Sequence, residues 1–148
     1  MKKKEIRLYK CIDFPGKWEF HTTLMKNVSA ADTIIFKNKD RWWLLTNIDQ
    51  SCVADHGCQL HIFSSNNPMS DEWIAHENNP VIFDPLIARN GGLILSDNEI
   101  YRVFQRQGFD MYGEGSGIAR ITRLSSTEYV EEICSLIQPK FFEGIKGT

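Results

Sequence analysis

Three polar side chains have the types and the spacing to form one binding site for a small hydroxylated or anionic ligand. Arg89 comes just before an extended apolar run, and Arg102 and Gln105 lie in the next such run. If the two runs pair as neighbouring strands, these side chains can project near the same end of them. Guanidinium and amide groups hold a sugar hydroxyl, a carboxylate or a phosphate through forked hydrogen bonds. The alternative is a structural role, in which the same groups tie neighbouring strands together.

The elements that would position these residues form a repeat. Two segments with the pattern of a β-hairpin begin at Asp32 and Gly91, which are 59 positions apart. The same separation joins residues 60–63 to residues 119–122. Two hairpin arms and a third strand at a fixed offset predict a repeated antiparallel sheet, as in the blades of a propeller. The repeat units are approximately residues 28–83 and 87–137.

Short strands are also predicted before the repeat, and turns are predicted at the hairpin tips. Residues 6–11 and 18–21 are short extended pieces, separated by a turn that contains Pro15 and Gly16. The hairpin tips at residues 37–40 and 96–99 have four polar residues each, which favours longer connections built on type I turns. In the first hairpin, Trp42 and Trp43 should face opposite sides of the sheet, so at least one belongs to the core.

The C-terminal third contains the one segment for which a helix competes with a strand. Residues 108–117 contain four glycines and are predicted to be the longest flexible stretch. Residues 128–134 then predict an outer strand, although Ser125 and Glu128 would also fit the capping box that starts a helix. The fold class expected for residues 1–148 is all-β, a single partial propeller domain of about two four-stranded antiparallel blades with flanking strands.

Composition excludes several classes of function. The chain has 148 residues, 42% of them hydrophobic, and a formal net charge of −2. Because binding to phosphate backbones needs a basic face, no nucleic-acid partner is expected. The charged start Met1–Lys4 is not followed by the apolar run of a signal peptide, and no segment is apolar enough to span a membrane. The sequence therefore predicts a cytoplasmic protein with no membrane partner, whose four cysteines are free thiols.

One segment carries side chains of the metal-ligating type. Cys52, Asp55, His56 and Cys58 lie within seven residues. Their spacing matches no structural or catalytic zinc pattern, so an ordinary loop is favoured. No metal site and no cofactor is predicted for the chain.

The order of several motifs resembles that of a known family. The motifs are 31–36, 41–45, 60–65 with Trp73 and Asn79–Pro80, Ala88–Arg89, Tyr101–Arg102 with Gln105, Tyr112–Gly113, and Tyr129 with Glu131. This order is similar to that of the five-bladed propeller domain at the N-terminus of plant glucosamine inositolphosphorylceramide transferases, which is also found in many bacterial proteins and is distantly related to glycoside hydrolase family 43. The resemblance runs from about Leu8 to Thr148 and covers about half of the family domain.

The resemblance implies a site without its catalytic groups. In the related hydrolases, three carboxylates meet at the central funnel, and Asp32 resembles the one that tunes the pKa of the acid. The position of the acid itself reads Ala88-Arg89-Asn90-Gly91, and the blade that carries the base is absent. A guanidinium remains charged and cannot act as the proton donor, so Arg89 does not replace the acid. No catalytic residue is therefore predicted.

The leading functional prediction is a non-catalytic or degenerate carbohydrate-associated module. It would bind a sugar or sugar phosphate around Asp32, Arg89, Arg102 and Gln105. Because an incomplete ring leaves apolar faces open, self-association is expected, with a homodimer as its form. One alternative is a hydrolase-like or glycosyl-transfer-associated enzyme domain that is active only when the missing blades are supplied. Another is an assembly protein with no small ligand.

Overall fold

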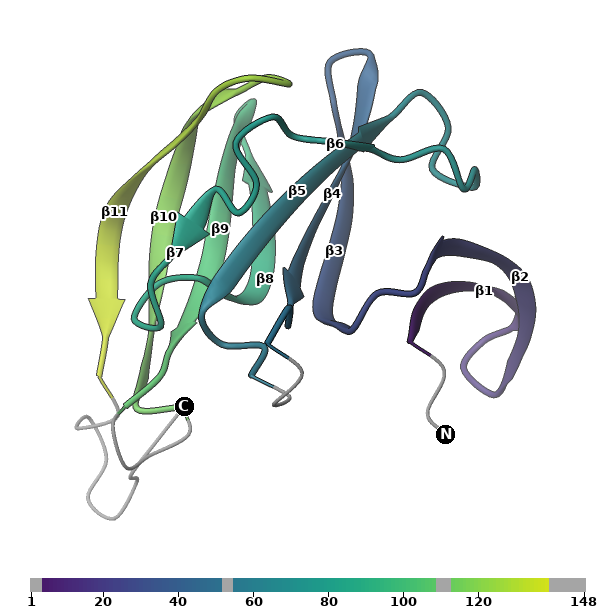
Figure 1. Cartoon of the computed structure of the whole chain (residues 1–148), viewed down its shortest axis with the longest axis horizontal. Helices are drawn as coiled ribbons and strands as arrows, with labels where there is room; N and C mark the ends of the chain where they lie inside the picture. Colours follow the sequence, from purple (N-terminus) through teal and green to yellow (C-terminus); the bar gives the residue numbers. More distant parts are fainter. Residues whose placement is uncertain (1–3, 52–54, 109–112, 139–148) are drawn as a thin grey trace.

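All regular elements of the described residues are β-strands (Figure 1). The computed structural model describes residues 4–51, 55–108 and 113–138. Its strands are β1 (Glu5–Asp13), β2 (Lys17–Lys26), β3 (Ala30–Asn38), β4 (Arg41–Ile48), β5 (Gln59–Ser65), β6 (Ile74–Ala75), β7 (Ile82–Phe83), β8 (Arg89–Ser96), β9 (Glu99–Arg106), β10 (Gly115–Leu124) and β11 (Tyr129–Ile137). The predicted all-β class is confirmed. Among these residues there is no helix with the length and apolar character to cross a membrane.

The strands form three antiparallel sheets. Strands β1 and β2 pair as an N-terminal hairpin. The first sheet has the order β3-β4-β5-β6, with β7 also paired to β5, and the second sheet has the order β8-β9-β10-β11. Figure 1 shows the hairpin on the right, the first sheet in the middle and the second sheet on the left. The leading strands β3 and β8 contact each other. This arrangement is consistent with neighbouring blades of a propeller.

The first sheet is covered on both faces, so that every residue of β4 from Trp43 to Ile48 is buried. Trp43 and Leu45 belong to the core between the two large sheets. Leu44 and Ile48 point the other way and pack with Leu24 of the N-terminal hairpin. This alternation is the period of two that a strand imposes. The prediction that at least one of the two adjacent tryptophans is in the core is confirmed, since Trp43 is only 4% exposed.

The hairpin tips are tighter than predicted. Only Lys39 and Asp40 connect β3 to β4, and only Asp97 and Asn98 connect β8 to β9. Lys39, Asp97 and Asn98 have positive φ angles of 55°, 50° and 66°. Two-residue hairpin loops favour positive φ because the resulting twist matches that of the strands, and Asn and Asp tolerate it. The expected four-residue connections are therefore wrong.

The tight tips also correct the register of the repeat. Asn38 pairs with Arg41 in the first hairpin, and Ser96 pairs with Glu99 in the second. The equivalent residues of the two hairpins are thus 58 positions apart and not 59. In the third strand, where Ile62 pairs with Leu45 and Ile118 pairs with Val103, they are 56 apart. A shift by one residue moves every side chain to the other face of its strand. The structural counterpart of Tyr101 is therefore Trp43, in the core between the sheets, and not Trp42.

The C-terminal strands resolve the choice between helix and strand. Residues 129–137 form β11, so the strand prediction is confirmed. The Ser125 hydroxyl accepts a hydrogen bond from the backbone N–H of Glu128 at 2.9 Å, as it would in a capping box, but here the bond closes the turn between β10 and β11. Gly115 and Gly117 belong to β10, so this end of the predicted flexible stretch is wrong. Residues 109–112 of that stretch lie outside the described residues.

Gly117 provides a test of the packing in the second sheet. It pairs with Phe104 across the β9–β10 ladder, and a Cβ atom on Gly117 would lie 2.2 Å from Cζ of the Phe104 ring. Phe104 is fully buried, so the ring has little room to move. Gly117→Ala should lower the free energy of unfolding by about 1–3 kcal/mol through overpacking, measured by urea denaturation.

The matched control is Gly16→Ala, because a Cβ atom at Gly16 meets nothing within 4 Å. Adding Phe104→Leu to Gly117→Ala should cost less than the sum of the two single changes, since the smaller side chain relieves the clash. Strictly additive costs would contradict the packing described.

Candidate functional site

Arg102 lies in the middle of β9 and is fully buried in spite of its charge. Its Nε and Nη2 atoms donate to the two carboxylate oxygens of Glu131 in β11, at 2.8 and 2.6 Å. The hydroxyl of Tyr129 donates to the same carboxylate, and burial raises the pKa of that hydroxyl. Burial alone would lower the pKa of Arg102, but the hydrogen bond and charge of Glu131 outweigh it and raise this pKa. Arg102 is therefore charged and paired within the second sheet.

The other contacts of Arg102 reach the backbone that leads into β8. Nη2 donates to the carbonyl oxygen of Ile87 at 2.7 Å. Nη1 lies 3.4 Å from the carbonyl oxygen of Ala88 and 3.5 Å from Oδ1 of Asn90. The guanidinium carbon also lies 5.5 Å from the centroid of the Phe104 ring. With no exposed surface, Arg102 positions the start of β8 and is not placed to contact a ligand, which is the structural role considered for it.

Two buried asparagines connect the first sheet to the start of β8. Asn47 donates from Nδ2 to the carbonyl oxygen of Ala88 at 2.9 Å, and its Oδ1 accepts from the backbone N–H of Asn90 at 2.8 Å. Asn90 in turn donates from Nδ2 to the carbonyl oxygen of Asp32 at 3.0 Å. Neither asparagine was predicted as a site residue. The signal available in the sequence is an amide side chain that follows the apolar run Trp42–Leu45 in β4.

Asp32 and Arg89 form an ion pair across the two leading strands. Oδ2 of Asp32 lies 3.0 Å from Nε of Arg89, and their side chains are 33% and 16% exposed. Asp32 has a positive φ of 51° and lies at a bulge in β3. Aspartate is one of the few residues that adopt this backbone conformation readily, and a bulge redirects the side chains of its strand. The bulge thus allows the Asp32 carboxylate to reach Arg89 in the next sheet.

Gln105 lies beside Arg89 but not beside Arg102. In the β8–β9 ladder Gln105 is the register partner of Arg89, and partners share one face of a sheet. Arg102 is three positions from Gln105 on the same strand, so it points to the opposite face. The structure therefore brings Asp32, Arg89 and Gln105 to one end of the sheets, opposite the hairpin tips. Arg102 supports them from the interior.

The segment with metal-ligating side chains forms a hydrogen-bonded loop. Asp55 accepts from Sγ of Cys58 at 2.9 Å and from the backbone N–H of Gly57 at 2.8 Å, and these bonds lower the pKa of Asp55. Burial, followed by the contact with Asp55, raises the pKa of Cys58 to about 11. Cys52 lies outside the described residues. Within residues 4–51, 55–108 and 113–138, no group of three or more His, Cys, Asp or Glu side chains could hold a metal ion.

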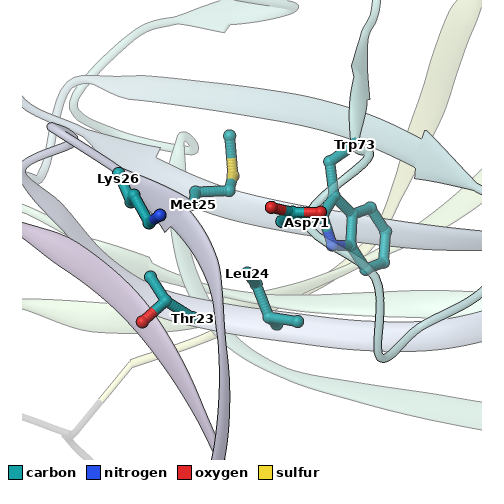
Figure 2. Close-up of a pocket in the computed structure, with 6 residues that line it drawn as sticks. All are labelled: Thr23, Leu24, Met25, Lys26, Asp71 and Trp73. Carbon is teal, nitrogen blue, oxygen red and sulfur yellow. The ribbon is translucent and has the colours of Figure 1, made fainter.

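A hollow of about 280 Å³ lies between the N-terminal hairpin and the segment that leads into β6 (Figure 2). Its lining residues are Thr23, Leu24, Met25, Lys26, Asp71 and Trp73. Two of them carry opposite charges, and the indole nitrogen of Trp73 is buried without a hydrogen-bond acceptor among the described residues. The sequence did not predict this hollow, because its two sides come from segments about 45 residues apart in the sequence.

Comparison with known proteins places the chain in a family. Residues 1–144 match the family model described as glucosamine inositolphosphorylceramide transferase 1, N-terminal. The chain belongs to this family. It is 31% identical over 130 residues to glucosamine inositolphosphorylceramide transferase 1 of Arabidopsis thaliana, and 31% identical over 133 residues to the protein of that name from Oryza sativa subsp. japonica. No solved structure showed a significant match.

The aligned region is a small part of these relatives. It covers 86% of the chain and 17% of the Arabidopsis protein, and 88% of the chain and 18% of the rice protein. The chain thus spans less than a fifth of the curated relatives it matches. The resemblance to this family predicted from the motif order is confirmed.

The buried ion pair should contribute far more to stability than an exposed one. Glu131→Gln removes the charge that compensates Arg102, whose side chain has no exposed surface, while Glu131 is only 8% exposed. Leaving a buried charge unpaired should lower the free energy of unfolding by about 3–5 kcal/mol. Chemical denaturation of the purified variant measures the loss.

The matched control is Arg120→Met in the same sheet. Arg120 bridges Glu99 and Glu132 on the surface. Exposed pairs contribute little to stability, so this variant should unfold close to the wild type. Equal losses for the two variants would mean that the Arg102–Glu131 pair has no special structural role.

Proposed function

We propose that the chain is a non-catalytic, carbohydrate-associated domain that binds a sugar or sugar phosphate at the Asp32–Arg89 pair. The observation that carries this proposal is an ion pair left partly exposed at the junction of two sheets and supported by a buried hydrogen-bond network. Binding sites are most selective when their polar groups are held in place before the ligand arrives. The family supports the carbohydrate class, since the name of its curated members refers to glucosamine.

The charge of the pair favours hydroxyl groups as its ligand. The carboxylate of Asp32 accepts hydrogen bonds and the guanidinium of Arg89 donates them, and together the two groups carry no net charge. The hydroxyl groups of a neutral sugar can therefore bind to both without separating the pair. A phosphate would have to displace the Asp32 carboxylate from Arg89. Gln105, next to Arg89 in the ladder, adds an amide that can both donate and accept.

The surroundings of the pair support a role without catalysis. The segment where the related hydrolases carry their acid reads Ala88 to Gly91, and within it Ala88 and Asn90 are buried. Hydrolysis of a glycosidic bond needs two carboxyl groups on opposite sides of the bond. On the proposed relation to glycoside hydrolase family 43, an enzyme would form only if another chain or copy supplied the missing carboxylates. The two large sheets would then be blades of a five-bladed propeller.

A role in assembly without any small ligand is the second candidate. It is favoured by large apolar side chains exposed on the N-terminal hairpin and on the second sheet, among them Phe14 at 81% and Leu136 at 51%. Exposed apolar clusters of this kind mark surfaces that bind other proteins. An assembly protein would show no response to sugars.

A thermal-shift screen of neutral monosaccharides, amino sugars and sugar phosphates tests the binding proposal. A ligand of the native state should raise the melting temperature in proportion to its concentration. Arg89→Ala should abolish this rise and leave the folded state intact, since Arg89 lies at the edge of the network. Arg123→Ala is the control, because Arg123 pairs with Glu128 on the exposed surface.

Three outcomes separate the candidates. A rise in melting temperature that survives Arg89→Ala, or no rise with any sugar, would reject the Asp32–Arg89 site. If Arg89→Ala unfolds, Asp32→Asn provides the same test, because it removes the charge and keeps the shape. Release of the aryl group from an aryl glycoside by the purified chain would reject the non-catalytic role.

A further inference from the structure

The corrected register shows that the two large sheets are stacked in the same orientation. With equivalent residues 58 positions apart, Trp43 and Leu45 in β4 correspond to Tyr101 and Val103 in β9. We call the faces that carry these residues the front faces. Leu44 corresponds in the same way to Arg102, and these residues lie on the back faces. The front face of the first sheet packs on the back face of the second.

The N-terminal hairpin follows the same order. Its apolar side, with Ile6 and Leu24, packs against Leu44 and Ile48 on the back face of the first sheet. The hairpin therefore covers the back face of the first sheet, and the first sheet covers the back face of the second. Among the described residues, no sheet is stacked on the front face of the second sheet or on the outer side of the hairpin.

The front face of the second sheet has an apolar stretch beside the ion pairs of Arg120 with Glu99 and Glu132. The register of each ladder gives the counterparts of its apolar residues in the first sheet. They are Phe36 for Ile94, Trp43 for Tyr101, Leu45 for Val103 and Ile62 for Ile118. Those four residues are at most 4% exposed, because the second sheet covers them. Ile94, by contrast, is 43% exposed. The second sheet thus keeps the apolar face that its counterpart uses for stacking, but without a neighbour.

The outer side of the N-terminal hairpin is aromatic. Tyr9 pairs with Phe20 and Cys11 pairs with Trp18, so the four side chains share one side. Tyr9, Trp18 and Phe20 are 45%, 54% and 56% exposed, and the Tyr9 and Phe20 rings form an edge contact at 5.8 Å. Isolated two-stranded hairpins are marginally stable in water. A partner on this side would remove its aromatic rings from solvent and stabilise it.

We propose that these two surfaces bind each other between two copies of the chain. The front face of the second sheet in one copy covers the outer side of the N-terminal hairpin in the other, which continues the order of stacking found inside each copy. In a closed dimer the same contact occurs twice, so neither surface remains exposed. The proposal of this contact does not rest on sugar binding, although Gln105 lies at one end of the same front face.

Static light scattering of the purified chain tests the proposal. The wild type should have about twice the mass of the 17.1 kDa chain at micromolar concentration. Ile94→Glu places a charge on the front face and should raise the dissociation constant by about tenfold or more, since burying an unpaired charge is costly. The control is Leu95→Glu, one residue further along β8 and on the opposite face, which should leave the mass unchanged.

The hairpin surface is tested by one disruptive variant and one control variant. Phe20→Glu should weaken association, whereas Glu19→Gln should not, because Glu19 lies on the other side of the hairpin from Phe20. Circular dichroism confirms that each variant is folded. If Phe20→Glu unfolds, Tyr9→Ser tests the same surface with a milder change.

Mixing the two disruptive variants distinguishes a contact between unlike surfaces from one between identical surfaces. Ile94→Glu keeps an intact hairpin and Phe20→Glu keeps an intact front face, so an equimolar mixture should form a heterodimer through one contact. A monomeric wild type, or a mixture that stays monomeric, would overturn the proposal. A response to sugars by any variant would leave this conclusion unchanged.

Discussion

The buried ion pair between Arg102 and Glu131 is the constraint on which the second sheet and the exposed site both depend. A guanidinium in the interior is tolerated only when opposite charge and hydrogen-bond acceptors surround it. Glu131 supplies the charge, and the carbonyl groups of Ile87 and Ala88 supply acceptors. The same bonds fix where β8 begins. Since Arg89 is the first residue of β8, a fully buried interaction determines where this exposed side chain lies.

Much of the fold could be predicted from the sequence because its strands form a repeat. The fixed offset between two similar segments identified both hairpins, and the polar tips located their turns. The choice of turn was less accessible, because it depends on left-handed backbone at Asp97 and Asn98, which is a preference of these residue types and not a requirement. The predicted offset of the repeat was therefore wrong by one residue, and it made Trp42, instead of Trp43, the counterpart of Tyr101.

The candidate site was predictable only in part, for a related reason. Residue type alone does not tell whether an arginine points into the solvent or into the core, and Arg102 became a ligand-binding candidate because it lies in the same strand as Gln105. Face assignment separates the two residues, since they are three positions apart on one strand. The contact between Asp32 and Arg89 depends on a bulge and on Asn47 and Asn90, whose bonds join segments more than 40 residues apart in the chain.

Asn47 and Gln105 occupy equivalent positions in the two sheets, and this equivalence connects the two functions proposed for the chain. Asn47 reaches from the front face of the first sheet to the backbone of Ala88 and Asn90, at the start of the next leading strand. Gln105 presents the same amide, with one more methylene of reach, on the front face of the second sheet. A sugar hydroxyl and a backbone peptide group can each donate a hydrogen bond to such an amide and accept one from it. A further sheet stacked on this front face would therefore lie next to the proposed sugar site at Arg89, and the ligand is expected to bind best where that part of the front face stays uncovered.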